Sequence, residues 1–490
     1  MEKFKEKFTT FFLTTLKVLM IVVMVASSGY IKNFNKNSII VGAILLSIIV
    51  IEVYIIKRNI CYKKQIALIL ICGFILRGLW LLNVKSIPIS DFSVIYECGQ
   101  EFLNGNTGMF WGHSYIARFP HLTIMVLYMA LMIKIFPTNN IVMMKLVNLA
   151  LGVLTIYIIY LLVKELFNSK KRGIYAASLA SIFPPFITYA GVFCTENVAI
   201  PLYLLSIYFF ILVIKNKKSK YYLILSGILL SIGNLFRMVA AIVVIAYSIY
   251  ILIYLKDKII HKLRNIAIYI VPYVVFLVVV SYTLQSLKIT EFPLWKGSEP
   301  KITSILKGSN LESNGRWNEK DAAIVEKYNY DYQKIQDASL EIIKERLTKT
   351  PPLELVKFYI RKIALQWNEG DFGGVYWTKL GVPEEDIKVD ISLEVLQIVY
   401  LSVMILIFIG LFNRKNNKDS QEINLLYIIL CGYGVMYLVT ESQGRYAYII
   451  SWIFIILAIE GINFILNKFK ISNIEYHNKY KKNFDLYKYS

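Results

Sequence analysis

The stretch Ser90-Asp91-Phe92-Ser93 begins the first long polar segment of a chain that otherwise consists mainly of apolar runs, and the segment closes at Arg118-Phe119-Pro120. It places a carboxylate at the edge of an apolar run, then aromatic residues, then a basic residue next to a proline. After Asp91, apolar residues recur at helical spacing on one face until Gly105, a stop signal. This pattern predicts an amphipathic helix that lies along a membrane surface. We expect the segment to form the floor of a site that the surrounding hydrophobic segments hold in place.

The composition predicts a membrane protein. The chain has 490 residues, of which 57% are hydrophobic, and a positive mean hydropathy. Several apolar runs reach about 20 residues, the length that crosses a hydrocarbon core of about 30 Å. The net charge of +21 does not indicate nucleic acid, because Lys and Arg cluster in short connectors between apolar runs, as in cytoplasmic loops. The sequence therefore predicts an all-α polytopic protein whose excess charge reflects topology and contact with anionic lipid.

Charge alternation predicts about twelve transmembrane helices, with both termini in the cytoplasm. The run from Pro120 to Phe136 could just span, but every later basic connector would then fall outside, so we expect it to be re-entrant or juxtamembrane. The expected spans are Phe11–Tyr30, Ile39–Ile56, Gln65–Leu82, Ile141–Val163, Ile174–Tyr189, Val198–Ile214, Tyr222–Leu235, Val239–Leu255, Ile266–Tyr282, Leu393–Phe412, Leu425–Val439 and Ala447–Ile465.

We expect three parts along the chain. Residues 1–286 form a transmembrane catalytic module with an outer loop at 85–139, residues 287–391 form an extracytoplasmic helical insert, and residues 392–490 form the last spans and a basic cytoplasmic tail. Within the insert, Lys320 to Leu347 is expected to form a polar helix. Pro351-Pro352 then opens an amphipathic helix that we expect to rest on the bilayer, with the apolar stripe Leu353, Val356, Ile360, Ile363 and Trp367.

The five cysteines, at positions 61, 72, 98, 194 and 431, show no metal-binding spacing. Cys98 and Cys194 both fall on the outer side, which leaves a disulfide between them open. No cofactor is indicated with certainty. A divalent ion could bind the acidic and histidine residues on the outer side, although they have no compact ligand spacing.

Ionisable residues near hydrocarbon cost free energy unless they are paired or used. Those expected at the outer membrane edge are the candidate site residues. Each also has a structural interpretation: Asp91 as a helix cap, Glu196 with Arg237 as an ion pair, Glu441 with Arg445 as a bridge along one helix. The candidates are Asp91 and Glu196 as catalytic residues, and Arg118, His121, Arg237, Glu441, Arg445 and Tyr446 as substrate-binding residues.

These residue types suit chemistry on a lipid-linked sugar phosphate. A fixed Arg neutralises the phosphate as the leaving group develops charge, and a carboxylate accepts the proton of the attacking hydroxyl. An alternative is a transporter or flippase of lipid-linked sugars. A flippase should carry polar residues through the mid-membrane and show paired halves, whereas here the polar groups gather at one face.

The order of several short motifs resembles the GT-C glycosyltransferases, in particular family 39 and its protein O-mannosyltransferase-like and aminoarabinose transferase-like branch. The motifs that carry this resemblance are Ser90-Asp91-Phe92, Tyr96, Phe102-Leu103-Asn104-Gly105, Tyr115, Arg118-Phe119-Pro120, Pro184-Pro185, Thr195-Glu196-Asn197 and Glu441-Ser442-Gln443-Gly444-Arg445-Tyr446.

The resemblance implies an inverting hexosyl or pentosyl transferase of the cell membrane with an outward-facing site. It implies a polyprenyl-phosphate sugar as donor and a glycan, lipid or protein as acceptor. The loop aspartate of the family maps to Asp91, its second acidic position to Glu196, and its phosphate contacts to Arg118 and Arg445. Two features depart from the family pattern: Phe92 stands where many relatives have Glu, and two spans precede the one that enters the first loop. With no soluble C-terminal domain in view, we expect the central insert to take part in acceptor recognition.

Overall fold

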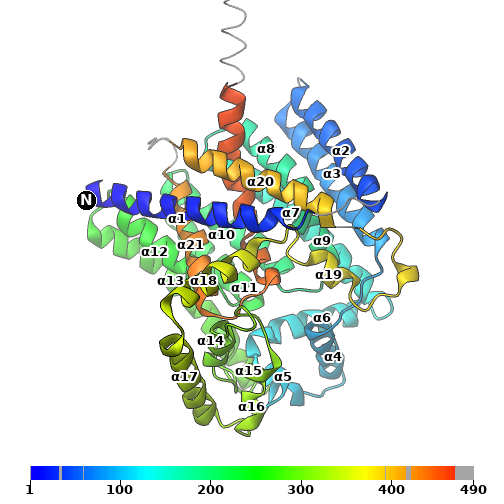
Figure 1. Cartoon of the computed structure of the whole chain (residues 1–490), viewed down its shortest axis with the longest axis vertical. Coiled ribbons are helices and arrows are strands. Elements are labelled where there is room, and N and C mark those ends of the chain that lie inside the picture. The colour runs from blue at the N-terminus through cyan, green and yellow to red at the C-terminus, as the bar shows by residue number, and fades with distance from the viewer. Residues whose placement is uncertain (1, 32–35, 59, 392, 415–420, 469–490) are drawn as a thin grey trace, which may run out of the picture.

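A computed structural model describes residues 2–31, 36–58, 60–391, 393–414 and 421–468. Helices dominate this part of the chain, and its β-structure is limited to an isolated bridge between Val84 and Ile387. The basic tail expected beyond residue 468 lies outside the described residues. The all-α fold class predicted from the sequence is confirmed (Figure 1).

Seven of the described helices are long and apolar enough to cross a membrane. They are α1 (Glu2–Ser28), α2 (Lys36–Lys57), α3 (Tyr62–Asn83), α7 (Asn140–Leu166), α10 (Glu196–Ile214), α13 (Ile259–Ser286) and α20 (Leu393–Asn413). Three shorter apolar helices accompany them: α11 (Tyr222–Phe236), α12 (Ala241–Tyr254) and α21 (Ile423–Val439).

Two further segments are each a pair of helices joined at a bend. Lys170–Ile182 (α8) and Pro184–Gly191 meet at 61°, and Gly444–Ile450 and Trp452–Lys468 meet at 63°. These ten helices and two bent pairs coincide with the twelve spans expected from the sequence. The polytopic architecture is therefore confirmed, while the number of actual crossings stays a prediction.

The bend after α8 has a chemical cause. Pro184 begins the short helix α9 (Pro184–Thr188), and proline cannot continue the hydrogen-bond ladder of the preceding helix. The freed carbonyl groups find a donor in Arg77 of α3, a fully buried residue whose Nη1 donates to the Ser181 carbonyl at 3.3 Å. Glu52 of α2, also buried, accepts hydrogen bonds from the hydroxyls of Ser178 and Ser181. These charged groups inside the apolar bundle thus have local partners, as burial requires.

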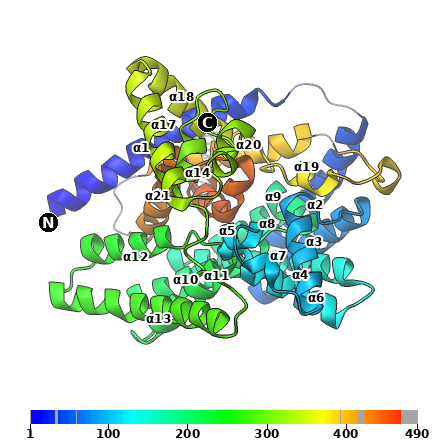
Figure 2. The same ribbon diagram turned by 90° about the horizontal axis from the view of Figure 1, so that it is seen from below.

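The central core includes α7, α10 and α11, which pack in sequence against one another, while α13 packs on α11 at the edge of the molecule (Figure 2). Aromatic rings fill this core, for example Phe210 of α10, which stacks on Tyr247 of α12 with centroids 3.9 Å apart. α1 lies beside α20 at the other side of the molecule.

The loop at 85–139, which the sequence predicts on the outer side, contains α4 (Asp91–Leu103), α5 (Tyr115–Arg118) and α6 (Thr123–Ile135), and α4 packs on α6 (Figure 1). The packing is close at Gly99, where a Cβ would lie 3.1 Å from the backbone nitrogen of Ala130. The chain turns by 109° between Gly108–Arg118 and Pro120–Ile135. This sharp turn agrees with the expected re-entrant or juxtamembrane course of 120–136.

The insert has a small core of its own, formed by Leu306, Ile324, Val325, Ile335 and Ile343. Its helices are α14 (Ile302–Gly308), α15 (Glu319–Ala322), α16 (Ile324–Lys327), α17 (Tyr332–Lys349), α18 (Pro352–Trp367) and α19 (Gly374–Lys379). The single helix expected over 320–347 is wrong, because Asn329 and Tyr330 have positive φ angles of 50° and 60°, which a right-handed helix does not accept.

α18 follows the expected amphipathic pattern only in part. Leu353, Val356 and Ile360 are exposed, as a helix resting on a bilayer requires. Lys362 lies off the apolar stripe, yet it is only 1% exposed. Its Nζ donates to the carbonyls of Gly308, Leu438 and Thr440 at 2.6, 2.9 and 2.8 Å. The lysine therefore ties the insert to the end of α21, whose last carbonyls have no partner within the helix.

Several basic connectors meet at one end of the bundle. Lys5 donates to Gln421 at 2.8 Å, and Lys256 lies 3.9 Å from the carboxylate of Glu2. At the same end, Lys217 pairs with Glu165 at 2.6 Å. This grouping agrees with the predicted charge alternation; which compartment faces that end stays a prediction.

Candidate active site

Asp91 is the first residue of α4, and the residue before it is strained. Ser90 has φ 55° and ψ −130°, a conformation that costs free energy in a residue with a side chain and is concentrated at functional sites. The Asp91 carboxylate, 41% exposed, accepts a hydrogen bond from Nη2 of Arg445 at 3.1 Å. Ser90 occupies the N-cap position of α4, so the interpretation of Asp91 as the helix cap is wrong. Burial and the Asp91 carboxylate raise the pKa of the Tyr115 phenol, which stays protonated beside it.

Arg445 follows the end of α21, in the segment 441–446, and its side chain is only 10% exposed. Its guanidinium lies 4.7 Å from the ring centroid of Trp377 and 5.3 Å from that of Phe92. Such contacts stabilise a partly desolvated cation. Nη1 of Arg445 is buried and makes no hydrogen bond. This nitrogen therefore has hydrogen-bonding capacity that the protein itself leaves unused.

Glu196 and Arg237 form an ion pair beside this arginine. Glu196 begins α10, Arg237 follows α11, and the atoms Oε1 and Nε are 3.3 Å apart. Neither atom makes a well-aligned hydrogen bond, so charge holds this pair together. The Arg237 guanidinium lies 4.9 Å from the ring centroid of Tyr446, and that of Arg445 lies 5.6 Å from the same ring. Tyr446 thus connects the Glu196 pair with the Asp91 pair.

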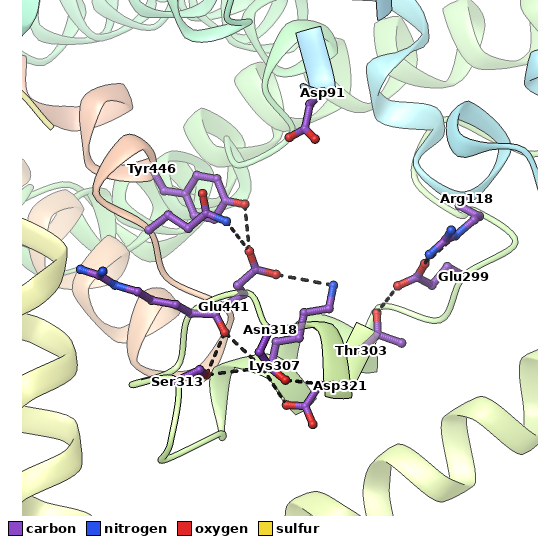
Figure 3. Close-up of polar contacts among 12 residues, drawn as sticks. Asp91, Arg118, Glu299, Thr303, Lys307, Ser313, Asn318, Asp321, Glu441 and Tyr446 are labelled. Carbon is purple, nitrogen blue, oxygen red and sulfur yellow. Dashed lines mark hydrogen bonds and ion pairs between the residues drawn. The ribbon is translucent and has the colours of Figure 1, made fainter. Parts of the chain in front are cut away.

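Glu441 is nearly buried and has three partners (Figure 3). Oε1 accepts hydrogen bonds from Gln443 at 2.8 Å and from the Tyr446 hydroxyl at 3.2 Å, and Oε2 lies 3.5 Å from Nζ of Lys307. The expected helical bridge from Glu441 to Arg445 does not form. Residues 440–443 are not helical, and Arg445 pairs with Asp91 instead.

Arg118 is engaged with the insert in this structure. Its Nη2 and Nε lie 2.6 and 2.8 Å from Oε2 of Glu299, whose other oxygen accepts from Thr303 at 2.6 Å (Figure 3). The ring of His121 lies against Phe119, with centroids 6.2 Å apart. Six of the eight predicted residues therefore form one connected group, whereas Arg118 and His121 stand beside it. Their substrate-binding roles stay predictions.

Two features of the site were missed from the sequence. Glu299 and Lys307 lie in the charge-balanced insert, where nothing in the sequence distinguishes them from surface residues. A cavity of about 270 Å³ borders Arg445, and its walls come from segments that are far apart in the sequence. Its lining residues are Arg316, Trp317, Glu369, Phe372, Gly373, Trp377, Gln443, Gly444 and Arg445.

Cys98 and Cys194 are both free thiols, so the disulfide left open between them does not form. Within the described ranges, no three His, Cys, Asp or Glu side chains come together as a metal site would require.

The chain has similarities to known proteins in sequence and in fold. Residues 121–284 match the family model described as dolichyl-phosphate-mannose-protein mannosyltransferase. The fold is similar to that of the apo oligosaccharyltransferase of Archaeoglobus fulgidus, with a TM-score of 0.50 and 14% identity, covering 86% of this chain and 52% of that one. A structure of the same enzyme with zinc and sulfate gives a TM-score of 0.41 and 14% identity, covering 82% and 50%.

The chain spans about half the length of these solved structures. No curated protein matches it by sequence. The family match runs from His121 to the last turns of α13 and includes Glu196 and Arg237, while the fold likeness extends over most of the chain. The family model covers only residues 121–284, and the fold likeness extends the comparison to the architecture alone, so the chain is a polytopic all-α membrane protein with similarity to the GT-C glycosyltransferases.

Proposed function

We propose that this protein transfers a sugar from a polyprenyl-phosphate donor to an acceptor at the outer surface of the cell membrane. The observation that carries the proposal is the pair of Asp91 and Arg445. It combines a half-exposed carboxylate with a buried guanidinium that has one nitrogen free of hydrogen bonds. A base for a hydroxyl and a cation for a phosphate thus stand next to each other at a membrane edge.

In the proposed reaction, the acceptor hydroxyl gives its proton to the Asp91 carboxylate and its oxygen attacks the anomeric carbon of the sugar. The bond from that carbon to the phosphate oxygen breaks, and polyprenyl phosphate leaves with the electron pair. Attack from the face opposite the leaving group inverts the anomeric centre. Arg445 neutralises the charge that develops on the leaving phosphate, where a preorganised cation is most effective.

The neighbouring pair acts through Arg445. Glu196 fixes Arg237 by charge, and the guanidiniums of Arg237 and Arg445 both lie against the ring of Tyr446. We assign Glu196, Arg237 and Tyr446 to positioning Arg445, and Glu441 to fixing Tyr446 through its hydroxyl. Arg118 could contact the phosphate only if its ion pair with Glu299 broke and the phosphate took the place of the carboxylate.

The experiment uses the purified chain in lipid nanodiscs with labelled polyprenyl-phosphate sugars and, in parallel, labelled nucleotide sugars. We expect release of polyprenyl phosphate from the lipid-linked donors alone. Reconstituted vesicles separate this function from the flippase alternative. Movement of the intact lipid-linked sugar across the bilayer without any release would contradict the proposal.

A further inference from the structure

The cavity beside Arg445 has walls from two parts of the chain. Arg316 and Trp317 come from the insert, and Glu369 and Trp377 come from the segment that joins α18 to α19. Arg445, which binds Asp91, lines the same cavity. A molecule in the cavity that contacts Arg445 would therefore share this guanidinium with the carboxylate proposed to deprotonate the acceptor.

Glu369 offers an unused hydrogen-bond acceptor to this cavity. Its Oε2 lies 3.6 Å from the position that a Cβ on Gly444 would take, so it faces the lining at that point. Its carboxylate makes no ion pair or hydrogen bond within the described residues, although Arg316 is near enough to act on it electrostatically. Burial, followed by the neighbouring Asp371 carboxylate, raises the pKa of Glu369. Asp371 itself is occupied, because its two oxygens accept from the backbone nitrogens of Gly373 at 3.1 Å and Val375 at 2.6 Å.

Hydrogen-bond donors and flat apolar surfaces complete the lining of the cavity. Nη1 of Arg445 is buried without a hydrogen bond, and Arg316 adds a second guanidinium. Trp317 is 56% exposed and Trp377 is partly exposed, so both rings present apolar area to a ligand. Small-molecule sites combine apolar walls with a few placed polar groups in this way.

This lining selects among the possible acceptors. A polyprenyl or acyl chain would leave Glu369 and Arg316 desolvated without partners, which costs free energy. A sugar ring has an apolar face for the indoles and hydroxyls that both donate and accept, matching the carboxylate and the guanidiniums. The volume of about 270 Å³ lies near the lower end of small-molecule sites, about 300–1,000 Å³, and so suits one ring more than an extended peptide.

We propose that the cavity binds one neutral sugar residue of a glycan acceptor, with Trp317 and Trp377 against the ring and Glu369 accepting hydrogen bonds from its hydroxyl groups. This assignment rests on the proposed transferase function and names its acceptor class. The sugar hydroxyl nearest to Asp91 is then the nucleophile.

The test measures binding without a donor, so it does not depend on turnover. The full chain in nanodiscs is titrated with methyl hexopyranosides, with the matching disaccharides and with a Ser/Thr-containing peptide, and tryptophan fluorescence or calorimetry reports binding. We expect saturable binding of at least one sugar probe and none of the peptide. In Glu369→Gln and Gly444→Leu the sugar affinity should fall about tenfold or more, because one acceptor charge or part of the volume is lost.

Glu345→Gln, on the exposed face of α17, and Gly434→Ala, whose Cβ would meet nothing within 4 Å, serve as matched controls that keep wild-type affinity. Peptide binding that depends on Glu369, sugar binding insensitive to both cavity changes, or no binding of any sugar probe would each overturn the assignment. Release of polyprenyl phosphate without sugar binding would refute only this inference. Sugar binding without any release would refute the transferase proposal instead.

Discussion

Replacing Arg445 by Lys separates charge from geometry at the proposed phosphate site. Lysine keeps the positive charge but is a point donor, whereas arginine presents a planar fork that can serve Asp91 and a phosphate together. In the structure Nη2 of Arg445 binds Asp91 at 3.1 Å, and Nη1 is buried without a hydrogen bond. Arg445→Lys can therefore keep one of these roles and loses the other.

The expected magnitude follows from the single interaction that is lost. A hydrogen bond to a charged group contributes about 1.5–3 kcal/mol, and each 1.4 kcal/mol or so is a factor of ten. The reduced stacking on Trp377 and Phe92 adds about 0.5 kcal/mol or more. We therefore expect kcat/KM for the lipid-linked donor to fall about 30- to 300-fold in Arg445→Lys.

The assay is steady-state transfer from a labelled polyprenyl-phosphate sugar, varied at a fixed acceptor concentration. Arg346→Lys is the control, because Arg346 also binds a carboxylate, in its case through two nitrogens at 2.7 and 3.1 Å from Asp321 within the insert. The control should lower thermal stability and leave donor kinetics unchanged. A kcat/KM of Arg445→Lys within twofold of wild type, or a loss no larger than that of the control, would refute the reasoning.

Two further predictions concern assembly and topology. Lys362→Met keeps most of the apolar part of the side chain but leaves three carbonyls without their donor, so we expect a loss of about 2–4 kcal/mol in stability, seen as a lower Tm. An unchanged Tm would contradict the role of Lys362. In a Cys61→Ser background, exposed cysteines introduced at Asn104 and Lys218 should react with an impermeant thiol reagent from opposite sides of intact cells; labelling from the same side would contradict the predicted topology.

The sequence predicted the apolar helices well because a span of sufficient length and hydropathy is a local property. The placement of Lys and Arg in alternate connectors is also a local property, so it could be predicted as well. The contacts of Lys5 and Lys256 at one end of the bundle agree with it. It also placed Asp91 and Arg445, 354 positions apart in the chain, at the same membrane edge. Their direct contact could not be derived, because it depends on how α4 and the segment after α21 pack.

The insert was predicted less well. Its charged residues are numerous and balanced, so the pattern alone cannot say that Glu299 turns inward to Arg118 while Glu345 stays exposed. The burial of Lys362 could not be predicted for a similar reason. Its burial is favoured by three carbonyls that other segments supply, and a helical-wheel pattern contains no information about them.

The most direct measurement of the central claim is the transfer rate of Asp91→Asn, compared with wild type in the same membranes and with the same labelled donor. Asparagine has nearly the shape of aspartate but cannot take the acceptor proton at neutral pH. Because general base catalysis contributes about 10²–10⁴-fold, the rate should fall by at least a hundredfold while labelled donor still binds. Transfer at the wild-type rate would mean that Asp91 only anchors Arg445, and the proposed mechanism would be wrong.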